Sequence, residues 1–212
     1  MPIKMRTTMV GDWGKARSIL EGGARLKKAI DLAVRQEAHD ARKQIVQGIR
    51  EQAPGGRRFA KLSPLTLAMR KFQGFKGSKA LLVTGTLRNS IVVKKAGSGR
   101  YFVGVLRTAR SKNDSRPVVN VAALHEYGGT VVVRVTPKMR KFLMMVMSRS
   151  KGRNKAGRSG KGQLARGVIV IKIPARPYIG PVIEKMGSSP AAVRKRLAQR
   201  ISRNMKLTLG KV

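Results

Sequence analysis

Apolar residues recur at helical spacing over residues 24 to 52, the longest periodic segment of the chain. Charged residues occupy the positions between them, so one face of a helix would be apolar and the other solvated. Pro54 and the two glycines after it end the pattern. The segment predicts one amphipathic helix of about 40 Å. Its apolar positions are Leu26, Ile30, Ala33, Val34, Ala41, Ile45 and Ile49.

Shorter helical patterns lie on both sides of this segment. Residues 12 to 21 have helical spacing, and Gly22 and Gly23 are expected to end that small helix before the long one begins. Residues 120 to 129 predict a short helical turn that ends at its two glycines. Residues 137 to 148 predict a further helix.

Two helix starts carry a capping signal. Ser63 precedes Pro64, so the serine can cap a short helix in residues 62 to 72 while the proline takes its first position. Ser189 and Pro190 carry the same signal for a basic amphipathic helix. The apolar residues of that last helix follow at i to i+4 spacing: Val193, Leu197, Ile201 and Met205.

Four segments have the β-branched content of strands. Residues 90 to 96 and 100 to 106 are joined by Gly-Ser-Gly, which predicts an antiparallel hairpin. Residues 130 to 135 and 167 to 173 predict two further strands. Residues 174 to 181 contain three prolines, each without a backbone donor, so this segment is not expected to be a strand interior.

These patterns together predict an α+β fold. A long N-terminal amphipathic helix would pack on a small, mainly antiparallel sheet, with short helices and a basic C-terminal helix. We expect an N-terminal extension at 1 to 22, a core domain at 23 to 187, and a basic C-terminal helix and tail at 188 to 212. A flexible basic insertion, residues 148 to 166, would interrupt the core domain.

The large excess of positive charge is the property of the sequence that says most about its partners. The chain has 47 lysines and arginines against 9 acidic residues, a formal net charge of +38. Such a chain repels itself, so we expect it to work beside nucleic acid or an acidic protein surface. Attraction to phosphate does not depend on base sequence, so the charge implies no sequence specificity.

The basic insertion has two interpretations. It contains four glycines, no acid and no aromatic residue. Most charge runs are solvated loops, but the rest of the chain is basic too, so the insertion extends the general field. We favour non-specific contact with a polyanion over base readout, because no aromatic residue offers stacking. Its seven cations are Arg149, Lys151, Arg153, Lys155, Arg158, Lys161 and Arg166.

Enzymatic chemistry finds little support among these residues. A metal-dependent nuclease needs two or three clustered carboxylates, and the nine acids are scattered. His39 and His125 each have an acidic neighbour in sequence, but adjacent helical residues point about 100° apart. The loop at 157 to 162 lacks a first glycine and a final Ser or Thr at the P-loop positions. We expect no catalytic residue, no cofactor and no metal ion.

Three other features bear on the surroundings of the chain. Without cysteines there can be no disulfide and no thiolate metal site. The longest apolar run, residues 142 to 147, is far shorter than the roughly 20 residues that span a bilayer, and no apolar signal-peptide region is present, so we expect no membrane association. The methionine-rich segment at 139 to 147 is either core or oligomer interface, or an adaptable partner-binding face.

Three phrases carry a resemblance to a known family. They are LLVTGTLRNSI at 81 to 91, VAALHEYGGTV at 121 to 131 and IPARPYIGP at 173 to 181, and they follow the long helix and a PGG...LSPLT segment. In this order the chain resembles the phage virion morphogenesis family, the tail completion or neck proteins of tailed bacteriophages. The matching residues are Thr84, Gly85, Leu87, Ser90, Ala123, His125, Tyr127, Gly128, Gly129, Ile173, Pro174, Ala175, Arg176 and Pro177.

The resemblance implies a noncatalytic virion component at the junction of head and tail. It implies a homo-oligomeric ring, with a hexamer favoured, that contacts other neck, tail terminator or connector proteins. Genomic DNA would be a further, non-specific partner. The chain would be found in the virion, and in the host cytoplasm during assembly. The basic insertion and the basic C-terminal helix exceed what the family pattern requires.

The matching residues also have a structural interpretation. Gly85, Gly128 and Gly129 would allow backbone turns that are closed to residues with a Cβ atom. Thr84 and Ser90 can bond nearby backbone groups.

The prolines on either side of Arg176 would fix an extended connection that holds its side chain in place. His125 has no nucleophile or carboxylate assigned to it, so a structural histidine beneath the turn is expected.

Two other classes of function stay open. A free nucleic-acid-binding or condensing protein would explain the charge but not the three phrases. A phage nuclease or maturation enzyme would require clustered carboxylates, which the sequence does not display.

Overall fold

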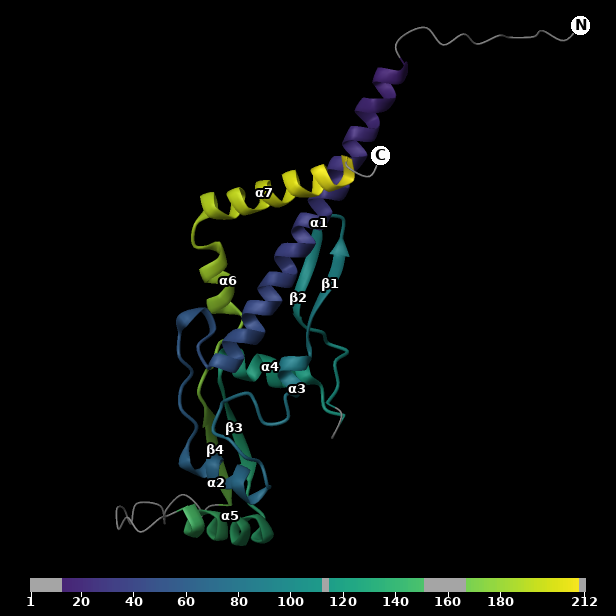
Figure 1. Cartoon of the computed structure of the whole chain (residues 1–212). Coiled ribbons are helices and arrows are strands. Elements are labelled where there is room, and N and C mark those ends of the chain that lie inside the picture. Colours follow the sequence, from purple (N-terminus) through teal and green to yellow (C-terminus); the bar gives the residue numbers. More distant parts are fainter. Residues whose placement is uncertain (1–12, 112–114, 151–166, 210–212) are drawn as a thin grey trace, which may run out of the picture. The chain divides into compact units, whose positions relative to one another are not determined.

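The computed structural model describes residues 13–111, 115–150 and 167–209, and over these ranges the α+β class is confirmed (Figure 1). None of the helices described there combines the length and the apolar content that a bilayer-crossing segment requires. The strands are β1 (Ile91–Gly97), β2 (Arg100–Val105), β3 (Gly129–Arg134) and β4 (Val168–Ile173). The helices are α1 (Trp13–Glu51), the 3₁₀ turn Pro54–Gly56, α2 (Pro64–Phe72), α3 (Thr86–Asn89), α4 (Val118–Tyr127), α5 (Pro137–Ser150), α6 (Gly180–Gly187) and α7 (Pro190–Leu209).

Helix α1 is a single helix of 39 residues that passes through Gly22 and Gly23. The expected break at these glycines is therefore wrong. A glycine inside a helix costs only about 1 kcal/mol relative to alanine, and good helix formers flank this pair. The predicted end of the helix before Pro54 is confirmed.

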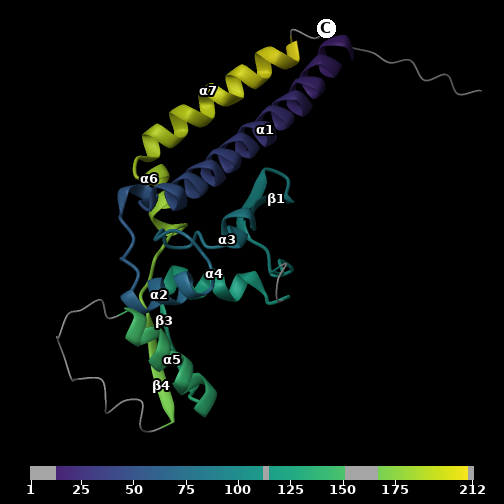
Figure 2. The ribbon, with the colours of Figure 1, turned by 60° about the horizontal axis from the view of Figure 1, so that its bottom comes forward.

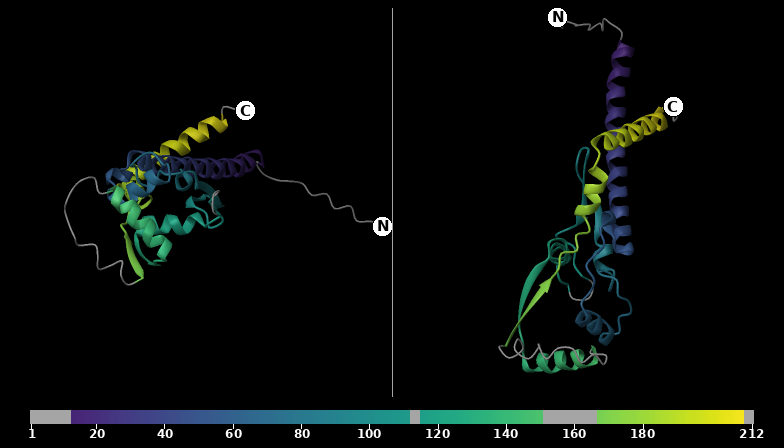
Figure 3. Two further views of the ribbon diagram at one scale, coloured as in Figure 1. Left: turned by 90° about the horizontal axis from the view of Figure 1, so that it is seen from below. Right: turned by 90° about the vertical axis from the view of Figure 1, so that its left-hand side faces the viewer.

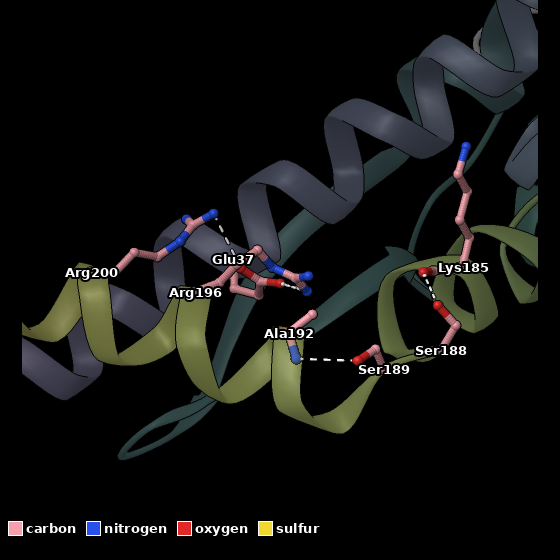
Figure 4. Close-up of polar contacts among 7 residues, drawn as sticks. All are labelled: Glu37, Lys185, Ser188, Ser189, Ala192, Arg196 and Arg200. Carbon is pink, nitrogen blue, oxygen red and sulfur yellow. Dashed lines mark hydrogen bonds and ion pairs between the residues drawn. The ribbon is translucent and has the colours of Figure 1, made fainter.

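Both predicted serine caps are confirmed. The backbone N–H of Thr66 donates to Ser63 Oγ at 3.2 Å at the start of α2. The N–H of Ala192 donates to Ser189 Oγ at 3.3 Å at the start of α7 (Figure 4). In both helices the proline after the cap takes the first helical position, where a missing N–H breaks no hydrogen bond.

The four strands form two separate two-stranded sheets instead of one small sheet. Strand β1 pairs with β2 as the expected hairpin, and β3 pairs with β4 in antiparallel register. Alternating patterns predict strands but not which strands pair, because pairing depends on contacts between distant parts of the chain. Helices α3 and α6 were not anticipated by the sequence pattern, since each is short and begins beside glycine or proline.

The chain divides into two compact units, and two elements contribute to both. Unit 1 consists of Met1–His39, Lys94–Phe102 and Ser189–Val212, and unit 2 of Asp40–Val93 and Val103–Ser188. Helix α1 and the β1–β2 hairpin each have one part in either unit. The three-part division expected from the sequence stays a prediction.

In unit 1, helix α7 lies against the first half of α1 (Figure 2). Ala29 and Ala33 of α1 are fully buried, whereas Leu26 and Ile30 are exposed, Leu26 to 44%. The predicted apolar face is therefore wrong at Leu26 and Ile30. Small alanine side chains permit a close approach, and the buried Asn204 of α7 donates through Nδ2 to the carbonyl oxygen of Ala29 at 3.2 Å.

Glu37 of α1 joins two arginines of α7 (Figure 4). Its Oε1 accepts a hydrogen bond from Arg196 Nη2 at 2.8 Å. Its Oε2 lies 3.1 Å from Arg200 Nη2, an ion pair whose angles do not meet hydrogen-bond geometry. One of the few acidic side chains thus offsets two cations of the basic helix.

Asp31, also on α1, holds the tip of the β1–β2 hairpin. Its carboxylate accepts hydrogen bonds from Lys95 Nζ at 2.8 Å, the Gly99 N–H at 3.0 Å and the Tyr101 hydroxyl at 3.0 Å. The hydrogen bond from Lys95, followed by that from Gly99, holds the pKa of Asp31 below its ordinary value.

The core of unit 2 lies between the second half of α1, the base of the hairpin and helices α3, α4 and α6. Ile45 and Ile49 of α1 are fully buried against Ile91 of β1. The expected packing of the long helix on antiparallel strands is therefore confirmed in this unit. The buried core cluster consists of Ile45, Ile49, Leu87, Ile91, Val105, Val118, Ala122, Tyr178 and Val182.

Strands β3 and β4 form a two-stranded ribbon within unit 2 (Figure 3). Val132 lies opposite Val170, and both side chains are largely exposed, at 65% and 57%. Beyond the ribbon, α5 packs on α2, where the rings of Phe72 and Phe142 meet edge to face with centroids 5.1 Å apart. The expected helix in the methionine-rich segment is confirmed as α5.

A single carboxylate clamps the start of α6. Glu126 Oε2 accepts hydrogen bonds from the N–H groups of Tyr178 at 2.8 Å and Ile179 at 3.2 Å, and Oε1 accepts from Gly180 at 2.8 Å. Three backbone donors that the helix itself cannot satisfy therefore have an acceptor. Sequence reasoning did not assign Glu126 a role.

We predict that Glu126→Gln lowers the free energy of unfolding by about 1–3 kcal/mol, because an amide offers one acceptor oxygen where three donors converge. Urea denaturation followed by circular dichroism measures this change. Glu184→Gln on α6 is the matched control, because its exposed ion pair with Arg57 is worth about 0–1 kcal/mol. Equal losses for the two variants would contradict the clamp.

Candidate functional site

A cavity of about 650 Å³ opens within unit 2. Its wall is formed by α2 and the residues before it, the segment from Ala80 to Leu87, helix α4, and strand β4 with the residues that follow. The cavity therefore collects residues from parts of the sequence that are far apart.

All three phrases of the family resemblance contribute to this cavity. The first phrase supplies the turn before α3, the second supplies a histidine on α4, and the third supplies the connection after β4. Six of the predicted site residues line it: Thr84, Gly85, Leu87, His125, Pro174 and Arg176.

The remaining residues of the phrases have other positions. Ser90 Oγ donates to the carbonyl oxygen of Leu87 at 2.7 Å, as the structural interpretation expects. Thr84, one of the six cavity residues, also bonds a nearby backbone group: its Oγ1 accepts a long hydrogen bond, 3.4 Å, from the N–H of Thr86. Tyr127 is 82% exposed, and neither it nor Pro177 lines the cavity.

Two of the three predicted glycine turns are confirmed. Gly85 and Gly128 have φ values of 75° and 74°, which residues with a Cβ rarely adopt. At Gly128 a Cβ would also lie 2.9 Å from the backbone nitrogen of Ala175. The prediction is wrong for Gly129, which has no positive φ and begins β3, where a Cβ would meet only the side chain of Leu124.

Arg176 is a buried cation held by carbonyl oxygens. Its Nε donates to Ala60 at 3.0 Å and its Nη2 to Lys61 at 3.2 Å, while its backbone N–H donates to His125 at 2.7 Å. The side chain is only 6% exposed, and none of the carboxylates in the described ranges pairs with it. The expectation that the proline-flanked segment holds Arg176 in place is confirmed.

Arg70 of α2 lines the same cavity and donates through Nη1 to the carbonyl oxygen of Lys79 at 2.8 Å. Burial lowers the pKa of Arg70, and the nearby charge of Arg176 lowers it further. Burial likewise lowers the pKa of Arg176. Two guanidinium groups thus share a partly desolvated space, and none of the described residues that line it is an acid.

His125 borders the two arginines. Burial, followed by the positive charge of Arg176, lowers the pKa of its imidazole, so the ring is held neutral at physiological pH. Its Nδ1 atom is buried without a hydrogen-bond partner. An unsatisfied buried nitrogen costs about 1–3 kcal/mol. The structural role expected for His125 stays a prediction.

Within the described part of the chain, the lining of the cavity has cations and no acid. Hydroxyl groups and apolar side chains complete it, the latter including Leu62, Val83, Val121 and Ile171. This arrangement can bind an anion through charge and hydrogen bonds, but it brings no carboxylate to His125 for acid–base chemistry. The five cations are Lys61, Arg70, Arg116, Lys172 and Arg176.

Sequence reasoning missed most of these cations. Lys61, Arg70 and Lys172 are three among 47 basic residues, so nothing in the sequence distinguishes them. The LSPLT segment, noted beside the three phrases, does supply Ser63 and Thr66 to the wall. That segment was the available signal.

Other predicted sites have different outcomes. Lys151, Arg153, Lys155, Arg158, Lys161 and Arg166 of the basic insertion lie outside the described residues, as does the side chain of Arg149. Within the described ranges, no group of three or more His, Cys, Asp or Glu residues is arranged to hold a metal ion.

No protein-family model matches the chain, and comparisons with curated proteins and with solved structures gave no significant match.

We predict that His125→Gln reduces the loss of stability on mild acidification. Because the folded pKa of His125 lies below its ordinary value, its stabilising contribution is complete above about pH 6.5 and is lost as the pH falls through the folded value. Unfolding free energies at pH 7.5 and 5.5 measure the effect. His39→Gln, at an exposed position of α1, should retain the full acid sensitivity; identical pH dependence in all three proteins would contradict the assignment.

Proposed function

We propose that this chain is a noncatalytic structural protein of a tailed bacteriophage, a tail completion or neck component at the head–tail junction. The observation that carries the proposal is the ordered set of three phrases, whose residues meet at one cavity of unit 2. Residues that are distant in sequence but adjacent in space form one structural feature. This supports reading the phrases together and not as three separate matches.

Charge supports an anionic working environment. The net charge is +38, and the acids Asp31, Glu37 and Glu126 are engaged in internal contacts. The excess therefore has to be balanced by something outside the chain. In a neck ring, with a hexamer favoured, that role falls to acidic surfaces of neighbouring terminator or connector proteins, or to genomic DNA passing the channel.

A free nucleic-acid-binding or condensing protein is the second candidate, and the charge favours it as much as the first. It predicts tight binding of a monomer to bare DNA, with an affinity that falls steeply as salt rises. It does not account for the three phrases.

We predict that the chain is present in purified particles at a fixed copy number. A structural part of a ring is retained through purification, whereas a condensing factor is lost in proportion to salt. Quantitative mass spectrometry of particles washed at low and high salt measures this. Absence from mature particles, or a copy number that varies with salt, would contradict the virion role.

Replacing the seven cations of the basic insertion by serine should reduce head joining or DNA retention while leaving the fold intact. The insertion contributes phosphate or carboxylate contacts through charge alone, so removing it weakens a non-specific interaction. Yields of joined particles and circular dichroism spectra measure the two effects.

The control removes the same charge elsewhere, by serine at seven exposed lysines. If this control reduces joining equally, the general charge and not the insertion is responsible. The control positions are Lys28, Lys43, Lys76, Lys94, Lys138, Lys185 and Lys195.

A further inference from the structure

The described residues that line the cavity of unit 2 bring cations together without a carboxylate beside them. Arg176 is 6% exposed and bonded to two carbonyl oxygens, and none of the described lining residues is an acid. Arg70 lies close enough to Arg176 that the positive charge of Arg176 disfavours the charged form of Arg70. Arg70 is half-buried, and like charges held together partly out of water disfavour each other, so an anion entering from outside would stabilise this pair.

Apolar side chains limit what that anion can be attached to. Leu62, Val83, Val121 and Ile171 line the cavity beside the arginines, and Val83 and Val121 are each 42% exposed. An occupant gains from these walls only if it places apolar atoms next to its anionic group. The cavity therefore favours an amphipathic anion over a bare one.

We propose that this cavity is a docking site for a partner protein, and that it receives a segment with a carboxylate beside an apolar side chain. The carboxylate would meet Arg70 and Arg176, and the apolar side chain would lie on the wall formed by Val83, Val121 and Ile171. The cavity volume of about 650 Å³ accommodates a few residues of an extended peptide. This docking site does not depend on the virion role.

Nucleic acid fits the same charges less well. The phosphates of a duplex lie on the outside of a stiff helix and carry no apolar group, so they cannot fill an apolar-walled cavity. After its bonds to Ala60 and Lys61, Arg176 still has N–H groups at the end of its guanidinium, and these can meet a carboxylate or a phosphate. The apolar wall, and not the guanidinium geometry, is what favours the peptide. Duplex DNA is accordingly the competing outcome in the test.

The test uses the full chain labelled with ¹⁵N and a capped tripeptide, acetyl-Leu-Glu-Leu-amide, which has one carboxylate between two apolar side chains. Titration should shift the amide signals of Gly85, His125 and Arg176 before others. The same peptide with glutamine in place of glutamate should leave them unchanged. Acetate tests whether a carboxylate alone is enough for binding. It should bind at least about tenfold more weakly than the tripeptide, because it lacks the two leucine side chains.

Two substitutions on α2 distinguish binding in the cavity from non-specific attraction to the positive charge of the whole chain. Arg70→Met removes a cation that lines the cavity, and Lys71→Met removes an exposed neighbour that does not. We expect the first to weaken tripeptide binding by about tenfold and the second by less than about twofold. Circular dichroism checks that both variants are folded.

Three results would overturn the docking site. Shifts scattered over exposed lysines would mean non-specific electrostatic attraction between the peptide and the basic surface. Equal binding of the glutamine peptide would mean that the cavity does not recognise the carboxylate. Displacement of the tripeptide from these amides by a 12-base-pair duplex, lost in Arg70→Met but not in Lys71→Met, would assign the cavity to nucleic acid. None of these results bears on the presence of the chain in particles, so the two proposals fail separately.

Discussion

Arg176 joins three separate stretches of unit 2 through one residue. Its guanidinium reaches the carbonyl oxygens of Ala60 and Lys61, and its backbone N–H reaches that of His125. Neutral carbonyls accept two of its five side-chain N–H groups but do not offset its charge. The geometry also depends on a planar fork with several donors, which a lysine would not reproduce. The walls of the cavity are therefore held by a group whose charge none of the described carboxylates balances.

The second phrase accepts hydrogen bonds from four backbone N–H groups of the third phrase. His125 accepts the N–H of Arg176, and the next residue, Glu126, accepts those of Tyr178, Ile179 and Gly180. Gly128 lets the two backbones approach without a Cβ between them. Two neighbouring residues of α4 thus serve different purposes, since one faces the cavity and the other secures α6.

Local signals in the sequence predicted local structure well. Ser63 and Ser189 correctly predicted the starts of α2 and α7, because a cap involves only the next few residues. Gly22 and Gly23 led to the prediction of a helix break that does not occur, because the modest cost of glycine in helix propensity is not enough to end a long helix. Leu26 was misplaced because helical spacing reveals that an apolar face exists, but not which residues a partner helix will cover. Cavity cations such as Arg70 could not be predicted, since only tertiary contacts distinguish them among 47.

The β3–β4 ribbon leaves apolar strand surface exposed when the chain is alone in solution. Val132 and Val170 face each other across two strands and leave β-branched surface open to water. Exposed ribbons of this kind are starting points for strand-by-strand aggregation between copies. The large charge of one sign opposes that process, because copies repel one another before the strands can meet. Ionic strength would then decide whether newly made chains stay dispersed, since added salt screens the repulsion and leaves the apolar surface unchanged.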